Sequence, residues 1–422
     1  MKIIAAADFS AVERLVAKNR SRRDATFDAR VRRVVDAVRA QGDKAVVRFA
    51  RRFDKATPPF EVSRRERDRA AATVPAPVRR ALAQAAESIA RVAFQQIPKH
   101  FDIRTGPGVT VEQRVEPLAR VGCYVPAGRF PLPSSLLMTA VPARVAGVRD
   151  IVVICPKPEP VVMAAAVEAG VSRLFRIGGA HGIAALAYGT DTVPRVAKIV
   201  GPGSRYVALA KAIVAADCAI DFYAGPTEIV IVSGDGRAEW IAADLVAQAE
   251  HDPDARSIFI TWKRTLASQV ARVVAARAAR HQLARQSLRA NGVIVVVRDA
   301  TQAMDFANRL APEHLVVDRE SLISESVTAG AVFVGPYSAQ AAGDYATGSN
   351  HVLPTAGAAR FRGGLSAADF VRVMSVQRLT REGLTRIAPT ITALARAEGL
   401  VAHAESIDIR LNRSMKTTSQ AQ

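Results

Sequence analysis

The chain has 422 residues, of which 49% are hydrophobic and 23% are charged, so it can bury a large core and general disorder is excluded. Its formal net charge is +19, but aromatic residues make up only 5% and the basic residues alternate with acidic residues and alanine. Because a nucleic-acid platform needs aromatic side chains among its basic ones, we expect no nucleic-acid partner and assign the arginines to exposed helix faces.

The start of the chain and its cysteines indicate the compartment. The opening "MKIIAAADFSAVERL" has a short apolar patch that Asp8 interrupts, and no apolar run reaches the roughly 18 residues of a membrane span. Cys123, Cys155 and Cys218 are widely spaced in apolar surroundings, as reduced core thiols are. We therefore expect a cytoplasmic protein without a membrane partner.

The predicted elements follow one another in four segments. Residues 1–104 are rich in Arg and Ala, with apolar residues at three- and four-residue steps, which predicts an N-terminal helical region. Over 105–235 short apolar runs such as "IVVIC" and "EIVIVSG" alternate with helical stretches, and over 236–375 the alternation restarts with "SIFIT", "GVIVVV" and "HLVVD". This alternation predicts an α/β fold with two tandem Rossmann-like parallel-sheet domains, and residues 376–422 are predicted to form a C-terminal helical tail.

The stretch "DLVAQAEHDPDA" places two potential metal ligands at the end of a predicted helix. Gln248 and His251 are three residues apart, so an amide oxygen and an imidazole nitrogen share one helix face. With an aspartate and another histidine they would make a donor set suited to zinc. His251 could equally cap the last carbonyls of the helix. The spacing alone leaves both interpretations open.

The segment "APEHLVV" joins a carboxylate and an imidazole, Glu313 and His314. If both line one cleft, they offer a general base and a proton shuttle near neutral pH. The alternative is that Pro312 and Glu313 cap a turn before a strand.

Four loops rich in glycine and proline precede predicted helices: "YVPAGRFPLPSSLLM", "RIGGAHGIAALAYG", "VGPGSRYVALAKAIV" and "FYAGPTEIVIV". Glycine permits close approach of the backbone, and exposed amides at a helix start favour phosphate. The dinucleotide fingerprint G-x-G-x-x-G is incomplete, because Tyr206 takes its third glycine position after Gly201 and Gly203. A dinucleotide site here would therefore differ from the standard first turn.

An ordered set of motifs over about residues 105–410 closely resembles the histidinol dehydrogenase family. The matching segments are "GCYVPAGRFPLPSSLLM", "IGGAHGIAALAYGT", "GPGSRY", "AIDFYAGPTEIVIV", "DLVAQAEHDPDA", "APEHL", "AGDYATGSNHVLPT", "GLSAADFVRVMSVQ" and "AEGLVAH". The resemblance implies a homodimeric enzyme of histidine biosynthesis that oxidises L-histidinol through the aldehyde to L-histidine. It also implies two NAD per turnover and one zinc ion (Zn2+) per subunit.

The resemblance also assigns roles to individual residues. Glu313 would activate water and His314 would relay protons. The zinc ligands would be Gln248, His251, Asp344 and His403. The substrate would be surrounded by Thr227, Gln248, His251, His314, Asp344, His351, Glu398 and His403, and the cofactor by Tyr124, His181 and Ser204. The active site would be shared between subunits, with Glu398 and His403 supplied by the tail of the partner chain.

Several positions depart from the family pattern. His181 stands where the family usually has Gln, Ser204 where it has Asn, Ala127 where it has Gly and Thr227 where it has Ser. His181 and Ser204 belong to the cofactor set, so we expect altered cofactor affinity or preference rather than a different reaction.

Two other functions remain open on the sequence. The segment "AGRFPLP" also resembles relatives that oxidise other small polar alcohols, including sulfonated diols, for which Arg129 could pair with the anionic group. The alternative function is therefore an NAD-linked dehydrogenase of the same fold with such a substrate. A degenerate member used as a binding scaffold is the other alternative, and the intact acid–base and ligand set argues against it.

Overall fold

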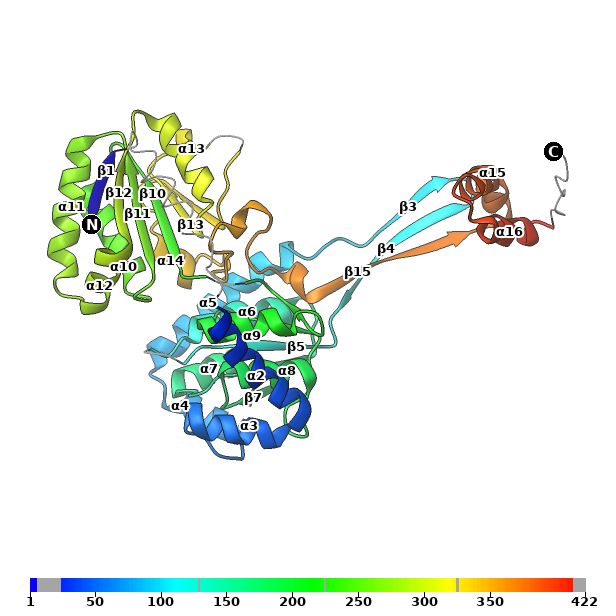
Figure 1. The fold of residues 1–422 in the computed structure, drawn as a ribbon, viewed down its shortest axis with the longest axis horizontal. Helices are drawn as coiled ribbons and strands as arrows, with labels where there is room; N and C mark the ends of the chain where they lie inside the picture. Colours follow the sequence, from blue (N-terminus) through cyan, green and yellow to red (C-terminus); the bar gives the residue numbers. More distant parts are fainter. Residues whose placement is uncertain (6–23, 128–129, 224, 324–325, 413–422) are drawn as a thin grey trace. The chain divides into compact units, whose positions relative to one another are not determined.

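The computed structural model divides the chain into two compact units, each made of two separate segments (Figure 1). Unit 1 comprises residues 1–96 and 118–370, and unit 2 comprises residues 97–117 and 371–422. The structure describes residues 1–5, 24–127, 130–223, 225–323 and 326–412. No helix among these residues is both long enough and apolar enough to cross a membrane.

The first sheet of unit 1 is built from the strand–helix alternation that follows residue 118. Its strands are β2 (Glu61–Val62), β5 (Arg120–Tyr124), β6 (Asp150–Ile154), β7 (Arg173–Phe175), β8 (Lys198–Val200) and β9 (Ala219–Ile220). They lie in the order β2-β7-β6-β5-β8-β9, and all neighbours run parallel except β2 and β7. The chain passes from β5 outward to β7 and then returns to β8 on the other side of β5. The strand order therefore reverses between β5 and β8.

Helices cover both faces of this sheet. On one face a buried cluster joins the sheet to α2 (Ala25–Gln41), α3 (Asp43–Phe49), α8 (Gly179–Tyr188) and α9 (Arg205–Val214). Four more helices pack against one another: α4 (Arg64–Thr73), α5 (Ala76–Gln95), α6 (Pro133–Val145) and α7 (Pro160–Glu168). A π-helical turn, η1 (Ala50–Asp54), follows α3. Apolar residues at three- and four-residue steps, such as Val31, Val35 and Val38 of α2, supply the buried face of each helix.

The second sheet of unit 1 is entirely parallel. Its strands are β1 (Lys2–Ala5), β10 (Glu228–Val232), β11 (Arg256–Thr261), β12 (Gly292–Val296), β13 (His314–Val317) and β14 (Ala331–Val334). Their order is β1-β12-β11-β10-β13-β14. Strands β10 and β11 are buried on both faces, as expected for a parallel sheet that is covered on two sides.

Two separate cores lie on the two faces of the second sheet, and Figure 1 shows the helices on opposite sides of it. One core includes α10 (Ala238–Ala249), α11 (Arg264–Ala278) and α12 (Gln282–Asn291). The other includes α13 (Ala300–Leu310). The shorter elements of this half are α14 (Gln340–Tyr345) and the 3-10 turns η2 (Glu320–Leu322), η3 (Ala358–Arg360) and η4 (Ala367–Phe370).

Unit 2 is a three-stranded antiparallel sheet with two helices. Strands β3 (Phe101–Gly106), β4 (Val109–Pro117) and β15 (Val371–Leu379) lie in the order β15-β4-β3. Helices α15 (Arg381–Ala397) and α16 (Val401–Arg410) follow. The buried carboxylate of Glu112 binds Arg114 and Arg378, and these two guanidinium groups hold the pKa of Glu112 at about 2.

The two ends of the chain differ from the sequence expectation. The N-terminal region is not helical throughout, because Lys2–Ala5 pairs with Val293–Val296 as an edge strand and residues 61–62 and 101–106 are also strands. The tail is not helical from residue 376, because β15 continues to Leu379 against β4. Strands β1 and β15 each pair with a strand that is distant in the sequence, and local periodicity does not reveal such pairing.

Candidate active site

Glu313 and His314 lie where strand β13 begins, beside the start of its parallel neighbour β10. His314 is level with Ile229 of β10 in the sheet. The two side chains are 6% and 4% exposed, and His314 Nδ1 is 3.7 Å from Glu313 Oε2. The sequence left open whether this pair only caps a turn. In the structure it is a buried carboxylate–imidazole pair at the amino edge of the second sheet.

Glu313 is held through one of its two oxygens. Oε2 accepts hydrogen bonds from the Thr227 hydroxyl at 2.5 Å and from the backbone N–H of Glu228 at 2.9 Å. Burial raises the pKa of Glu313 to about 8, although both hydrogen bonds lower it, and the nearby Asp344 raises it further. A carboxyl group with this pKa can take up and release a proton near neutral pH.

His314 is oriented by a backbone carbonyl and by Gln340. Its Nδ1 lies 3.2 Å from the carbonyl oxygen of Glu228, which only accepts, so Nδ1 carries the hydrogen. Its Nε2 lies 3.3 Å from Gln340 Nε2 and is therefore the acceptor in the neutral ring. Burial lowers the pKa of His314, which favours that neutral form.

Gln340 also connects the acid–base pair to a predicted metal ligand. Besides contacting His314, its amide nitrogen donates to Asp344 Oδ2 at 2.8 Å. It is 1% exposed and lies on α14 with Asp344. Sequence reasoning missed Gln340. The available signal was its position four residues before Asp344, which places the two on one helix face.

Gln248 has a buried amide oxygen that lacks a partner. The residue is fully buried near the end of α10, and its Nε2 donates to Thr227 Oγ1 at 2.5 Å. Thr227 donates in turn to Glu313, so this chain of bonds determines which end of the amide is the nitrogen. Gln248 Oε1 then has no hydrogen-bond partner, although a buried polar atom usually has one. A bound cation would satisfy it.

Asp344 and His351 complete the cluster. His351 Nδ1 lies 3.1 Å from the carbonyl oxygen of Asp344, and His351 Nε2 lies 3.3 Å from Ser135 Oγ on α6. Burial lowers the pKa of His351, Asp344 raises it, and the nearby His314 and His251 lower it further. His251 follows α10 and is exposed.

Glu398 and His403 belong to unit 2. Glu398 directly follows α15 and His403 lies in the first turn of α16, and both are exposed. Within the described part of the chain no three His, Cys, Asp or Glu side chains form a metal-binding group. The predicted ligand set differs from such a group, because one of its donors is the amide of Gln248. Arg129, predicted from the sequence as a partner for an anionic group, lies outside the described residues.

The predicted cofactor residues lie at the carboxyl edge of the first sheet, whereas Glu313 and His314 lie at the amino edge of the second. Tyr124 ends β5, Ser204 directly precedes α9, and His181 lies in the first turn of α8. Because the strand order reverses between β5 and β8, a crevice for a ligand is expected at this point of an open α/β sheet. Tyr124 comes from β5, and Ser204 comes from the loop that follows β8.

His181 makes a contact that the sequence did not suggest. It is 1% exposed, and its Nε2 lies 2.9 Å from Asp54 Oδ2 at the end of η1. The same oxygen accepts the N–H of Gly178 at 2.9 Å, so Asp54 binds both His181 and the start of α8. The Asp54 carboxylate was missed because it lies 127 residues away in the sequence.

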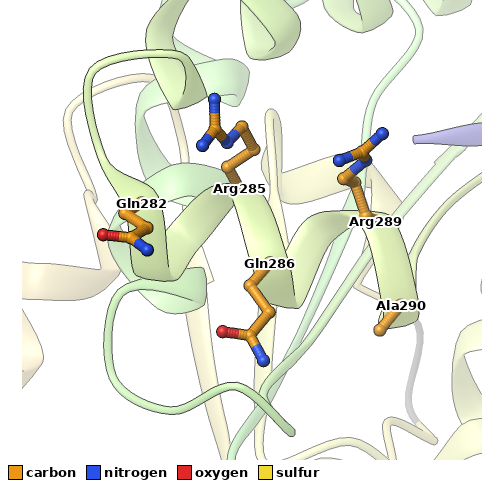
Figure 2. A pocket seen from close by; sticks show the side chains of 5 residues that line it. All are labelled: Gln282, Arg285, Gln286, Arg289 and Ala290. Carbon is orange, nitrogen blue, oxygen red and sulfur yellow. The ribbon is translucent and has the colours of Figure 1, made fainter.

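A surface pocket of about 400 Å³ lies on α12 (Figure 2). Its lining residues are Gln282, Arg285, Gln286, Arg289 and Ala290. Figure 2 shows these side chains projecting from a single helix. None of the acid–base, ligand or cofactor candidates lines this pocket, and it is therefore not the candidate site.

Comparisons with known proteins show the family to which the chain belongs. The family model "Histidinol dehydrogenase" matches residues 17–411. Histidinol dehydrogenase of Brucella suis is 44% identical over 399 residues, covering 91% of this chain and 93% of the relative, and that of Aquifex aeolicus is 43% identical over 397 residues, covering 92% and 93%. The crystal structure of histidinol dehydrogenase from Elizabethkingia anophelis matches with a TM-score of 0.90 and 32% identity over 98% of both chains. With this agreement over nearly its whole length, the chain belongs to the histidinol dehydrogenase family.

Proposed function

We propose that this protein oxidises L-histidinol to L-histidine through the aldehyde, with two NAD per turnover and one zinc ion per subunit. Membership of the family makes it an NAD-dependent oxidoreductase. One observation carries the proposal: the buried Glu313–His314 pair is joined through Thr227 to the amide nitrogen of Gln248, whose amide oxygen has no partner. The arrangement places proton-transfer groups next to a potential metal ligand.

The residues present fit a zinc ion. Gln248, His251 and Asp344 offer one amide oxygen, one imidazole nitrogen and one carboxylate, and His403 would add a second imidazole. Without a cation, Gln248 Oε1 is a buried acceptor with nothing to accept. When bound, the zinc would supply electrostatic positioning of the polar groups of the substrate.

Each member of the Glu313–His314 pair would accept one of the transferred protons. In the alcohol step, His314 would accept the hydroxyl proton at Nε2, the nitrogen with the lone pair, where the substrate would take the place of the Gln340 N–H. NAD, when bound, would supply the hydride acceptor. In the aldehyde step, Glu313 accepts a proton from the attacking water. Both of its described hydrogen bonds fall on Oε2, so Oε1 is the oxygen that we assign to this task. By binding Oε2, Thr227 and the N–H of Glu228 fix the orientation of the carboxylate and therefore the position of Oε1.

The organisation predicted from the sequence is part of the proposal. Residues 105–235 would hold NAD through Tyr124, His181 and Ser204. Residues 236–375 would carry the metal and acid–base groups, and both parallel-sheet domains would be Rossmann-like. In a cytoplasmic homodimer, the tail 376–422 would reach the partner subunit, so that Glu398 and His403 complete the site of the other chain.

The direct test is the yield of NADH from L-histidinol with zinc-loaded protein. The proposal expects two NADH and one L-histidine for each L-histidinol consumed. In the Glu313→Gln variant the yield should fall toward one NADH, with the aldehyde recovered by a trapping reagent. Glu320→Gln, which changes an exposed carboxylate on η2, is the matched control. No turnover of L-histidinol, together with turnover of a sulfonated diol, would select the alternative dehydrogenase.

Subunit mixing tests the shared site. Activity is measured here as L-histidine formed, which Glu313→Gln and His403→Ala chains would each fail to produce alone. If each site takes His403 from the other chain, half of the randomly mixed dimers contain one intact site, and about a quarter of the wild-type activity returns. Sites that are complete within one chain would give no recovery on mixing.

A further inference from the structure

A buried ion pair that takes no part in the proton transfers lies at the carboxyl edge of the first sheet. Lys211 of α9 contacts Asp221, which directly follows β9, and their side chains are 2% and 0% exposed. Burying two opposite charges is costly unless further hydrogen bonds satisfy both groups. The remaining partners of the pair therefore indicate what it does.

Both charged groups bind the backbone of the same residue, Gly201. Lys211 Nζ donates to the carbonyl oxygen of Gly201 at 3.0 Å, and Asp221 Oδ2 accepts the N–H of Gly201 at 2.7 Å. The other oxygen of Asp221 accepts the N–H of Phe222 at 2.6 Å. The ion pair thus closes on the donor and the acceptor of one glycine.

Gly201 is the residue at which the chain leaves β8 for the predicted cofactor loop. Its φ is +114°, which favours glycine, and a Cβ added there would lie 2.2 Å from the carbonyl oxygen of Tyr124. Two residues later, a Cβ added at Gly203 would lie 3.2 Å from the Tyr124 ring. Ser204 follows directly. By holding Gly201, the ion pair therefore determines how the loop 201–204 packs against Tyr124.

We propose that Lys211 and Asp221 are positioning residues for the cofactor. They hold the backbone of Gly201, so that the loop 201–204 keeps its NAD-binding conformation against Tyr124. This inference rests on the proposed use of NAD. The pair acts through the loop and touches neither the reacting atoms nor the metal ligands. Its loss should therefore weaken NAD binding and leave zinc binding unchanged.

The chain offers a matched control of the same chemistry. Lys198 on β8 of the same sheet pairs with Asp369 at 2.8 Å, with side chains 12% and 19% exposed. In the described contacts Lys198 binds only the side chain and carbonyl of Asp369, not Gly201. Lys198→Met therefore removes a Lys–Asp pair without releasing the loop.

The test compares Lys211→Met, the double variant Lys211→Met/Asp221→Asn, Lys198→Met and the wild type. NAD binding is measured by calorimetry, zinc binding by competition with a chelating dye, and stability by urea unfolding. Lys211→Met leaves Asp221 as an unpaired buried charge, so its stability should fall. The double variant removes that charge and recovers stability, but it still lacks the donor to the carbonyl of Gly201.

We expect at least about a tenfold loss of NAD affinity in both Lys211 variants, because small displacements of a binding loop have effects of this size. Zinc affinity should stay within about twofold, and Lys198→Met should bind NAD like the wild type. Recovery of NAD affinity together with stability in the double variant would overturn the inference and leave the pair a purely structural role. Absence of NAD binding by the wild type would instead refute the proposed function.

Discussion

Replacing Glu313 by Gln should stabilise the protein while impairing its proposed chemistry, and the stabilisation should grow with pH. Raising the pKa of Glu313 from 4.5 to about 8 corresponds to about 5 kcal/mol, at roughly 1.4 kcal/mol for each pKa unit. Because the folded state binds this proton more tightly than the unfolded state, the wild type loses stability as the pH rises from about 4.5 to about 8. The neutral Gln side chain carries no such penalty.

From these two pKa values, the Glu313→Gln variant gains about 1 kcal/mol over the wild type at pH 5 and about 5 kcal/mol at pH 9. Urea unfolding of both proteins at several pH values measures the difference, with zinc removed because a bound cation would itself lower the pKa of the carboxyl group. Glu320→Gln, at an exposed position, is the control for replacing a glutamate by glutamine. The reasoning fails if the Glu313→Gln difference does not grow between pH 5 and pH 9.

Three further substitutions test the remaining contacts. Gln248→Leu removes the unpartnered oxygen, so zinc affinity measured with a competing chelator should fall more than about 100-fold without loss of stability; unchanged affinity would exclude Gln248 as a ligand. Gln340→Leu removes the donor to His314 Nε2, and kcat should fall about tenfold with an altered ¹⁵N shift of that nitrogen, whereas an unchanged shift would contradict the contact. His181→Ala frees Asp54, and calorimetry should show NAD binding weakened about tenfold; wild-type affinity would refute the cofactor role of His181.

The two halves of unit 1 use their sheets differently. Tyr124 and Ser204 lie at a carboxyl edge, where open parallel sheets usually bind ligands. Glu313 and His314 lie at an amino edge, because one directly precedes β13 and the other begins it. One of the hydrogen bonds between the two sheet domains of unit 1 runs from Asn350 Nδ2 to the carbonyl oxygen of Met138, at 2.7 Å. This bond holds the loop that carries His351 against α6.

The sequence alone was sufficient for features that depend on neighbouring residues. The alternation of short apolar runs and helices predicted the parallel strands β6 and β10 to β13, since burial on both faces demands continuous β-branched runs. The sequence also predicted the helix that carries Gln248 near its end, although α10 ends at Ala249 and His251 lies beyond it. Glu313 and His314 are neighbours in the sequence, and their side chains lie 3.7 Å apart. These patterns are local, so they can be recognised before the chain folds.

Only the tertiary structure decided which distant groups meet. Gln340 reaches His314, Asp54 reaches His181, and Lys211 closes with Asp221 on Gly201, all through side chains brought together by the sheets. The sheet of unit 2 likewise pairs β4 with β15 across more than 250 residues of intervening chain. A contact of this kind depends on the path of the backbone between its partners, and local composition and periodicity do not encode that path.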